Sequence, residues 1–380
     1  MTALAVTLPT RHVGPLLRVD ISAVTANTRL LASQTTAEVM AVVKADGFGH
    51  GAVEVARAAL AGGATSLGVT SIEEALPLRE AGLGTRLLSW LNPVDADFAT
   101  AVRAGVEIAV PSREHLDAVA RQGVAARVHL QLDTGLARDG AAPGEWVALC
   151  RAARSAERTG HLQVVGVMGH LACADEPGHP ANASGRTRFV RGVRIARAAG
   201  LRPHTRHLAA TAATLTDPLA HHTLVRVGAG LVGIDPAGST RLRPAMTLTA
   251  PVVTVRRVRA GTPVGYGHTW IAPAATMLGL LPLGYADGLP CAASGRAEVL
   301  VRGRRRSVVG RISMDQVIVD LGAEGVRLGE VATIFGPGDN GEPTVADWAS
   351  WSDTLEHEVV TGLGARVRRV VTRPGLLSLA

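Results

Sequence analysis

From residue 39 to about residue 233, short apolar runs alternate with segments of helical periodicity. The runs that predict strands are 39–43, 66–69, 86–89, 107–110, 127–132, 163–168, 205–208 and 223–227. Helical patterns lie between them, for example at 51–61, 72–81, 113–121, 145–155 and 185–199. This alternation predicts a parallel sheet with right-handed crossovers, and eight such units predict an α/β fold, the closed (β/α)8 or TIM barrel. A further helix at 22–32, with Ser22 as its N-cap, is expected before the first strand.

The alternation of apolar runs and helical segments ends near Pro244, and strand-like segments follow. The segments 252–258, 277–283, 298–301, 306–310, 316–320 and 331–334 predict strands, and Gly and Pro separate them. We therefore expect two domains, a barrel over 16–241 and a mostly β C-terminal domain over 242–380. Residues 1–15 are expected to pack with the second domain.

Composition narrows the possible functions. The chain has 380 residues, of which 47% are hydrophobic and 19% charged, which is typical of a globular protein with ample core. Its net charge of +7 is scattered, apart from a short arginine cluster at 302–306, so no nucleic-acid partner is expected. The 3 cysteines lack ligand spacing, which argues against zinc and disulfides. With no signal peptide or apolar span, we expect a cytoplasmic protein that binds no membrane.

Lys44 is the only lysine, although Lys and Arg together number 39. Arginine can replace a solubilising lysine, but its guanidinium stays protonated and cannot act as an amine nucleophile. The surviving lysine is therefore a candidate functional residue. It closes the first apolar strand, where partial burial should lower the pKa of its amine.

Further polar residues fall at the carboxyl ends of predicted strands, where barrel enzymes place their catalytic groups. They are Asp133, Arg138, His170, His207, Thr211 and Arg226. The turn that begins at Gly228 exposes backbone N–H groups and suits a phosphate. Considered one at a time, Asp133 is expected to order a loop and His50 to pack at a helix start. His170 and His207 have core packing as an alternative, and their positions at strand ends favour roles in the site.

Four segments carry a family resemblance. They are AVVKADGFGHG at 41–51, VGYGHT at 264–269, GYADG at 284–288 and GRISMDQ at 310–316. Together they resemble the alanine racemase family of enzymes that depend on pyridoxal phosphate (PLP), and the similarity runs from about Leu17 to Val371. The resemblance implies a racemase that interconverts the enantiomers of a small amino acid, alanine or an analogue such as serine. It also implies a homodimer with shared active sites and no metal.

The resemblance assigns roles by position. Lys44 carries PLP as a Schiff base and is one base, and Tyr266 of the second subunit is the other. The residues implied to bind the cofactor are Lys44, Phe48, His170, His207, Thr211, Arg226, Gly228, Ala229 and His357. Arg226 is expected to bind the pyridine nitrogen, with His207 supporting it. Arg138, Met314 and Tyr285 are implied in substrate binding, and Tyr285 is alternatively a dimer-interface residue.

Several positions depart from the family pattern. Phe48 and His357 stand where relatives have tyrosines at the phosphate, and each missing hydrogen bond to a charged group costs about 1.5–3 kcal/mol. Gln131 replaces a modified lysine, although its amide oxygen can accept from Arg138. Ala210 replaces an asparagine. The smaller His357 leads us to hypothesise a pocket that admits a substrate other than, or larger than, alanine, with serine as one candidate.

Two alternatives stay open beside racemisation. One is another PLP reaction on the same scaffold, namely decarboxylation, retro-aldol cleavage or elimination. The other is a relative that binds PLP without catalysis. Retention of Tyr266 favours racemisation, because proton removal on one face and delivery on the other need two acid–base groups.

Overall fold

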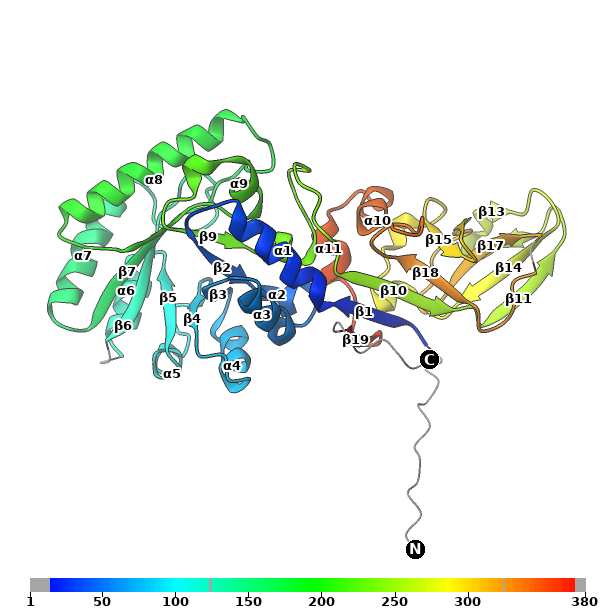
Figure 1. Cartoon of the computed structure of the whole chain (residues 1–380), viewed down its shortest axis with the longest axis horizontal. Coiled ribbons are helices and arrows are strands. Elements are labelled where there is room, and N and C mark those ends of the chain that lie inside the picture. Colours follow the sequence, from blue (N-terminus) through cyan, green and yellow to red (C-terminus); the bar gives the residue numbers. More distant parts are fainter. Residues whose placement is uncertain (1–13, 123–124, 324, 373–380) are drawn as a thin grey trace, which may run out of the picture. The chain divides into compact units, whose positions relative to one another are not determined.

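The structure, a computed structural model, describes residues 14–122, 125–323 and 325–372. It divides into two compact units (Figure 1). One unit is the barrel, Asp20–Ala245. The other contains the described residues before Asp20 together with Met246–Val371. The expected domain boundary at 241/242 thus lies four residues before the division between units. Residues 16–19 group with the C-terminal unit, and residues 1–13 lie outside the described ranges.

The barrel unit contains the predicted 8-stranded sheet, with strand order β8-β7-β6-β5-β4-β3-β2-β9. Its strands are β2 (Glu38–Val42), β3 (Ser66–Val69), β4 (Arg86–Ser89), β5 (Val106–Val110), β6 (Ala126–Gln131), β7 (Leu162–Met168), β8 (Thr205–His207) and β9 (Leu224–Val227). Neighbouring strands in this order pair in parallel. Between β9 and β8, hydrogen bonds from Thr223 N to Arg206 O (3.1 Å) and from Arg226 N to Ala209 O (3.0 Å) bring the two ends of the sheet together.

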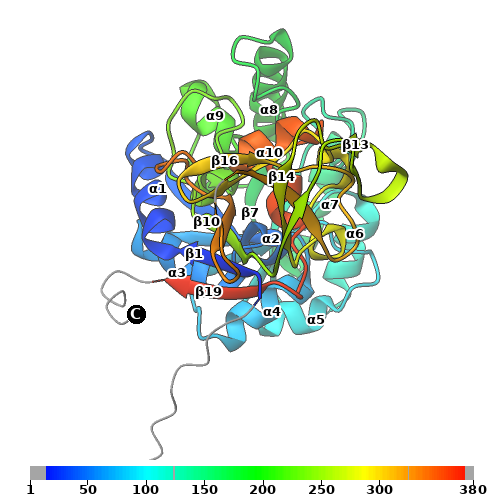
Figure 2. The same cartoon turned by 90° about the vertical axis from the view of Figure 1, so that its right-hand side faces the viewer.

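Helices surround these strands (Figure 2). They are α1 (Ile21–Ser33), α3 (Ala52–Ala61), α4 (Ile72–Glu80), α5 (Phe98–Arg103), α6 (Arg113–Ala120), α7 (Trp146–Arg158), α8 (Pro180–Ala198) and α9 (Thr211–Thr216). The short element α2 (Lys44–Phe48) follows β2 and has left-handed backbone angles. The barrel strands are buried on both faces, as the residues of β5 show, which explains their continuous apolar runs.

Helix starts required two corrections to the sequence prediction. The N-cap of α1 is Asp20, whose side chain accepts from Ser22 N at 2.9 Å, and not Ser22 itself. Helix α8 begins at Pro180, five residues before the expected start, because His179 caps it and proline suits the first helical position. The short helices α5 and α9 were not predicted.

The C-terminal unit is mostly β, as expected. A 6-stranded sheet has the order β16-β15-β18-β10-β1-β19, beside a 3-stranded sheet β11-β14-β17 and a hairpin β12-β13. These strands are β1 (Leu16–Asp20), β10 (Met246–Pro251), β11 (Thr254–Val258), β12 (Pro263–Val264), β13 (Trp270–Ile271), β14 (Thr276–Leu281), β15 (Glu298–Val301), β16 (Arg304–Ser307), β17 (Val317–Gly322), β18 (Val331–Phe335) and β19 (Arg368–Thr372). Two helices, α10 (Val345–Trp351) and α11 (Glu356–Thr361), follow β18.

Strand β1 explains why the first described residues belong to this unit. It pairs antiparallel with β10, for instance Leu17 with Leu248. Buried and partly buried residues alternate along β10 and β17, as expected for antiparallel sheets with one covered face. Within the described ranges, every helix is too short or too polar to span a bilayer.

Candidate active site

Arg226, at the end of β9, is the most connected of the predicted site residues. Its Nη1 donates to Nδ1 and to the backbone oxygen of His207, both at 2.9 Å. Its Nη2 donates to Gly169 O at 2.7 Å and to His170 Nδ1 at 3.2 Å. Among the described residues, none accepts a hydrogen bond from its Nε. Arg226 is only 5% exposed, and the N–H at its Nε is not used by these hydrogen bonds.

The structure brings Lys44 and Arg138 close to this arginine. Burial lowers the pKa of Lys44, and the charges of Arg138 and Arg226 lower it further, while the carboxylate of Glu74 acts in the opposite direction. Burial and the charges of Arg226, Arg138 and Lys44 likewise lower the pKa of His170 to about 3. The mouth of the barrel thus holds a partly buried amine with a lowered pKa and a neutral imidazole.

The turn after β2 positions Lys44 with an unusual backbone. Ala45, Asp46 and Gly47 adopt left-handed helical angles, and Phe48 also has a positive φ of 56°. Such angles cost roughly 1–2 kcal/mol for each residue other than glycine. Glu74 of α4 compensates in part, because its Oε1 accepts from Ala45 N at 2.7 Å. Sequence reasoning did not select Glu74.

The residues of the predicted phosphate cup lie where α9 begins and β9 ends. The hydroxyl of Thr211 accepts from Gly228 N at 3.2 Å and from Gly230 N at 3.3 Å. Ala229 lies between these two glycines and is buried. Phe48 contributes its ring to the same place, because a Cβ atom at Gly228 would meet that ring.

Arg138 stands on an ordered loop after β6. Asp133 Oδ1 accepts from Gly135 N at 2.8 Å and from Ala137 N at 3.1 Å, so this carboxylate orders the loop, as the simpler interpretation predicted. Gln131 Nε2 donates to Asp139 Oδ2 at 3.0 Å. Among the described residues, no donor reaches the buried Oε1 atom of Gln131, so the amide oxygen does not accept from Arg138 here.

Three predicted residues belong to the C-terminal unit, and we refer to Tyr266, Tyr285 and Met314 as the tyrosine patch. They are 71%, 46% and 53% exposed, respectively. Tyr285 N donates to Ser313 O at 3.0 Å, next to Met314 in the chain. A Cβ at Gly284 would stand 2.1 Å from Ser313 O, so this close approach requires glycine. The segments at 264–265 and 310–311 also run side by side.

His357 belongs to the first turn of α11 in the C-terminal unit and is half-buried. Two buried polar residues that the sequence did not single out, Glu107 of β5 and His129 of β6, lie beyond His207. His129 Nδ1 is 2.8 Å from His207 Nε2, and His129 Nε2 is 2.8 Å from Glu107 Oε2. Both lie inside strands rather than at strand ends, so their position along the chain carried no signal.

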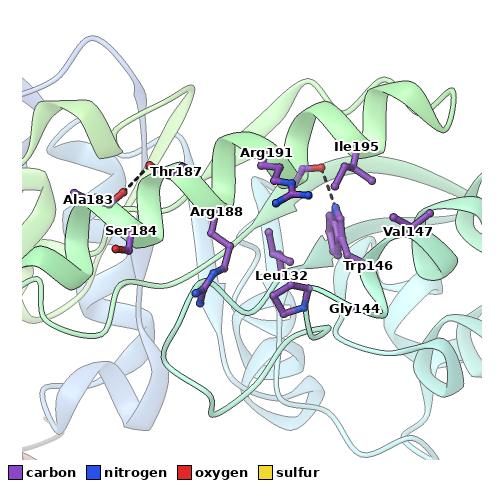
Figure 3. A pocket seen from close by; sticks show the side chains of 12 residues that line it. Leu132, Gly144, Trp146, Val147, Ala183, Ser184, Thr187, Arg188, Arg191 and Ile195 are labelled. Carbon is purple, nitrogen blue, oxygen red and sulfur yellow. Dashed lines mark hydrogen bonds between the residues drawn. The ribbon is translucent and has the colours of Figure 1, made fainter.

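A groove of about 720 Å³ lies elsewhere on the barrel unit, between α7 and α8 (Figure 3). Leu132, Trp146 and Arg188 are among its lining residues, and Trp146 Nε1 donates to Gly192 O at 2.9 Å. None of the predicted site residues lines this groove. The barrel mouth, and not this groove, holds the predicted site residues.

Comparisons with known proteins agree with this architecture. Residues 19–236 match the family "Alanine racemase, N-terminal domain", and residues 245–371 match "Alanine racemase, C-terminal domain". An alanine racemase from Thermobifida fusca (strain YX) is 47% identical over 363 residues, which is 93% of this chain and 97% of the relative.

Solved structures give the same result. The crystal structure of an alanine racemase from D-cycloserine-producing Streptomyces lavendulae has a TM-score of 0.92 and 42% identity, and the match covers 95% of this chain and 98% of that one. An alanine racemase from Bartonella henselae, solved with covalently bound pyridoxal phosphate, has a TM-score of 0.86 and 26% identity over 95% of this chain and 100% of that one. This chain therefore belongs to the alanine racemase family.

Proposed function

We propose that this chain is a PLP-dependent racemase that interconverts L- and D-alanine, with the amine of Lys44 as the attachment point of the cofactor. One observation carries the proposal. At the position where this family attaches its cofactor, Lys44 has a lowered pKa and lies near the buried Arg226, whose Nε has no hydrogen-bond acceptor among the described residues. Family membership favours racemisation over the other PLP reactions and over a non-catalytic relative.

The residues at the barrel mouth fit PLP. Lys44 would hold its aldehyde carbon and the Nε of Arg226 its ring nitrogen. Burial lowers the pKa of Arg226 to about 10, so this side chain still carries its proton at neutral pH and remains a donor. The cup of Thr211, Gly228 and Ala229 would hold the phosphate, with Phe48 packed against it. When bound, PLP supplies the electron sink that makes the α-proton of an amino acid removable.

The proton transfers fall to two side chains of different kind. Lys44 holds or releases a proton at its amine on one face of the substrate. Tyr266 does so at its phenol oxygen on the opposite face, and we propose that it comes from a second subunit. His170 supports this arrangement as a neutral ring that accepts from Arg226. Two groups on opposite faces allow removal and delivery without turning the substrate.

Substrate orientation falls to Arg138 and the backbone at Met314, which would bind the carboxylate. Arg138 offers a planar pair of donors suited to two carboxylate oxygens. Tyr285 would border the same space. His357 would lie on the phosphate and substrate side, where its N–H can replace part of the hydrogen bonding of a phenol.

The tyrosine patch supports a homodimer. Its three large side chains are 46–71% exposed in the single chain, although aromatic and methionine side chains are enriched in protein interfaces. We propose that the patch of each subunit covers the barrel mouth of the other, so that each active site takes Lys44 from one chain and Tyr266 from its partner.

The proposal is tested with single enantiomers of alanine in deuterated water, followed by chiral analysis and mass spectrometry. Inversion with solvent deuterium at Cα is expected, and release of carbon dioxide or ammonia would overturn it. Because the chain has a single lysine, borohydride reduction and proteolysis should place the cofactor on Lys44. K44R is the matched control: it keeps the charge and should lose both the cofactor adduct and inversion.

A further inference from the structure

A continuous chain of buried polar side chains crosses the barrel from β9 to β5. It runs from Arg226 through His207 and His129 to Glu107, with atom-to-atom distances of 2.9, 2.8 and 2.8 Å. The four side chains belong to residues that are 5%, 0%, 1% and 4% exposed, respectively. We call these four residues the buried relay. One charged end of the relay is Arg226 of the proposed site. The other is the carboxylate of Glu107, which the proposed function does not use.

A glycine in the intervening strand β7 leaves the space that the relay occupies. His129 and His207 lie on β6 and β8, with β7 between them. Gly166 of β7 pairs with His129, and a Cβ atom at Gly166 would stand 2.1 Å from His129 Nδ1. The imidazole therefore lies directly over the glycine and reaches across one strand. Any other residue at 166 would displace it, so the contact between the histidines depends on this glycine.

Hydrogen-bond chemistry permits one arrangement of protons along the relay. The guanidinium of Arg226 can only donate, so His207 Nδ1 accepts and its proton lies on Nε2. That proton is donated to His129 Nδ1, so the proton of His129 also lies on Nε2. The carboxylate of Glu107 can only accept and receives it. Both histidines are thus neutral, with all donors pointing from the arginine to the carboxylate.

We propose that Glu107 is a positioning residue of the racemase, which acts through His129 and His207 to hold the buried Arg226 as a charged donor in one orientation. This inference rests on the function proposed above. A carboxylate at the far end leaves His129 no alternative tautomer, and His129 in turn leaves none to His207. Without that end group, His129 Nε2–H would be buried without an acceptor, which costs about 1–3 kcal/mol and favours rearrangement.

The charge state of each member agrees with this scheme. Burial alone would raise the pKa of Glu107, but hydrogen bonds from His129 and Arg127, together with the charge of Arg127, outweigh it and hold the carboxyl well below its usual range. Burial lowers the pKa of His129 and of His207, so both rings are neutral at neutral pH. The relay therefore connects a buried cation to a buried anion, which is what buried charges require.

Other charged groups face the relay from neighbouring elements. Arg127 binds the second oxygen of Glu107 at 2.8 Å and is itself 45% exposed at the side chain. The charge of Glu107 partly offsets the lowering of the Arg79 pKa by burial. The charge of Arg86 adds to the lowering of the pKa of both histidines, and His204 adds to that of His129. Arg127 provides the matched control, because it contacts Glu107 but not the histidines.

The first test reads the histidine tautomers in the wild-type enzyme, and substitutions serve only to assign signals. The holoenzyme labelled with ¹⁵N-histidine is examined by NMR between pH 6 and pH 8, with H129Q and H207Q used to assign the ring signals. We expect both His129 and His207 to carry their single proton on Nε2 across this range. A proton on Nδ1 of either ring, or a doubly protonated ring, would overturn the proposal.

The second test compares E107Q and E107D with R127M. In E107Q the loss of one charged hydrogen bond is expected to lower kcat about tenfold with little change in KM. The acid-side midpoint of kcat/KM should move to lower pH, because a site without this anion releases protons more readily. E107D should recover part of kcat, and R127M should keep the wild-type kcat, midpoint and tautomers.

Two results would count against Glu107 as a positioning residue. One is an E107Q enzyme that matches R127M in kcat and pH profile. The other is a lower kcat in both variants with no shift of the midpoint, which is the result of a purely structural defect. Failure of the proposed function looks different, since wild-type protein would then not racemise alanine while its histidine signals still report the relay.

Discussion

The ring of Phe48 lies so close to the backbone of Gly228 that a Cβ atom added at the glycine would stand 2.7 Å from Phe48 Cζ. This contact joins the left-handed turn after Lys44 to the proposed phosphate cup. It also means that the para position of the ring points at the cup, where a tyrosine would carry its hydroxyl.

F48Y should therefore bind PLP more tightly. A phenol at this position adds a hydrogen bond to a charged phosphate, which corresponds to about tenfold in the dissociation constant. The constant is measured by absorbance titration of the cofactor-free protein with PLP. F48L is the control, because it removes the ring and adds no donor, and it should not tighten binding. Equal affinities of F48Y and the wild type would show that the hydroxyl does not reach the phosphate.

Mixing two inactive variants tests whether active sites are shared. K44A should lack the cofactor attachment and Y266F one proton carrier, so each homodimer is inactive. In a mixed dimer, one site keeps Lys44 from one chain and Tyr266 from the other. Random exchange of subunits makes about half of the dimers mixed, and each mixed dimer has one intact active site of two. About a quarter of wild-type activity should therefore return. No recovery after verified subunit exchange would place both groups in the same chain.

Acidification should weaken the fold through its buried histidines. His129 and His207 have pKa values lowered chiefly by burial, so the unfolded chain binds these protons at higher pH than the folded chain does. The free energy of unfolding therefore falls as the pH drops below about 6.5, by up to about 1.4 kcal/mol per pH unit for each histidine.

Chemical denaturation of the holoenzyme at several pH values from 7 to 5 measures this slope. Because the pKa of Glu107 is lowered in the fold, its carboxylate contributes stability above the ordinary carboxyl pKa. That contribution is lost only at lower pH, so the slope between pH 7 and pH 5 reports the histidines. High salt, which screens surface charges, should leave the slope in place. A free energy of unfolding that stays constant or rises toward pH 5 would contradict the neutral, buried rings.

H357Y should narrow the substrate range. If His357 borders the substrate, a larger phenol leaves less room for the serine hydroxymethyl group. The ratio of kcat/KM for serine to that for alanine should then fall about tenfold, in line with the selectivity of pockets that discriminate by one small group. L355Y adds the same ring at a position that is 69% exposed and should leave the ratio unchanged. Equal ratios in H357Y and the wild type would remove His357 from the substrate wall.

Local patterns in the sequence were sufficient for the barrel. The strand carrying Lys44 was expected at 39–43 and spans Glu38–Val42, and the strand carrying Arg226 was expected at 223–227 and spans Leu224–Val227. Buried parallel strands must be apolar throughout, so they appear as short apolar runs in any single sequence. Strands β1 and β10 were missed; they pair with each other across more than two hundred positions of the chain, which no local pattern reveals.

The sequence by itself determined the fold class, the family and the reactive groups at strand ends, because these depend on periodicity and on motifs that are local in the chain. Only the tertiary structure decided which buried groups share hydrogen bonds. Glu107, His129 and His207 are 22 and 78 residues apart in successive steps and meet only because the sheet curls and Gly166 leaves space for a ring. The role of a buried polar side chain depends on the group to which it is hydrogen-bonded. That group is determined by packing across strands rather than by position along the chain.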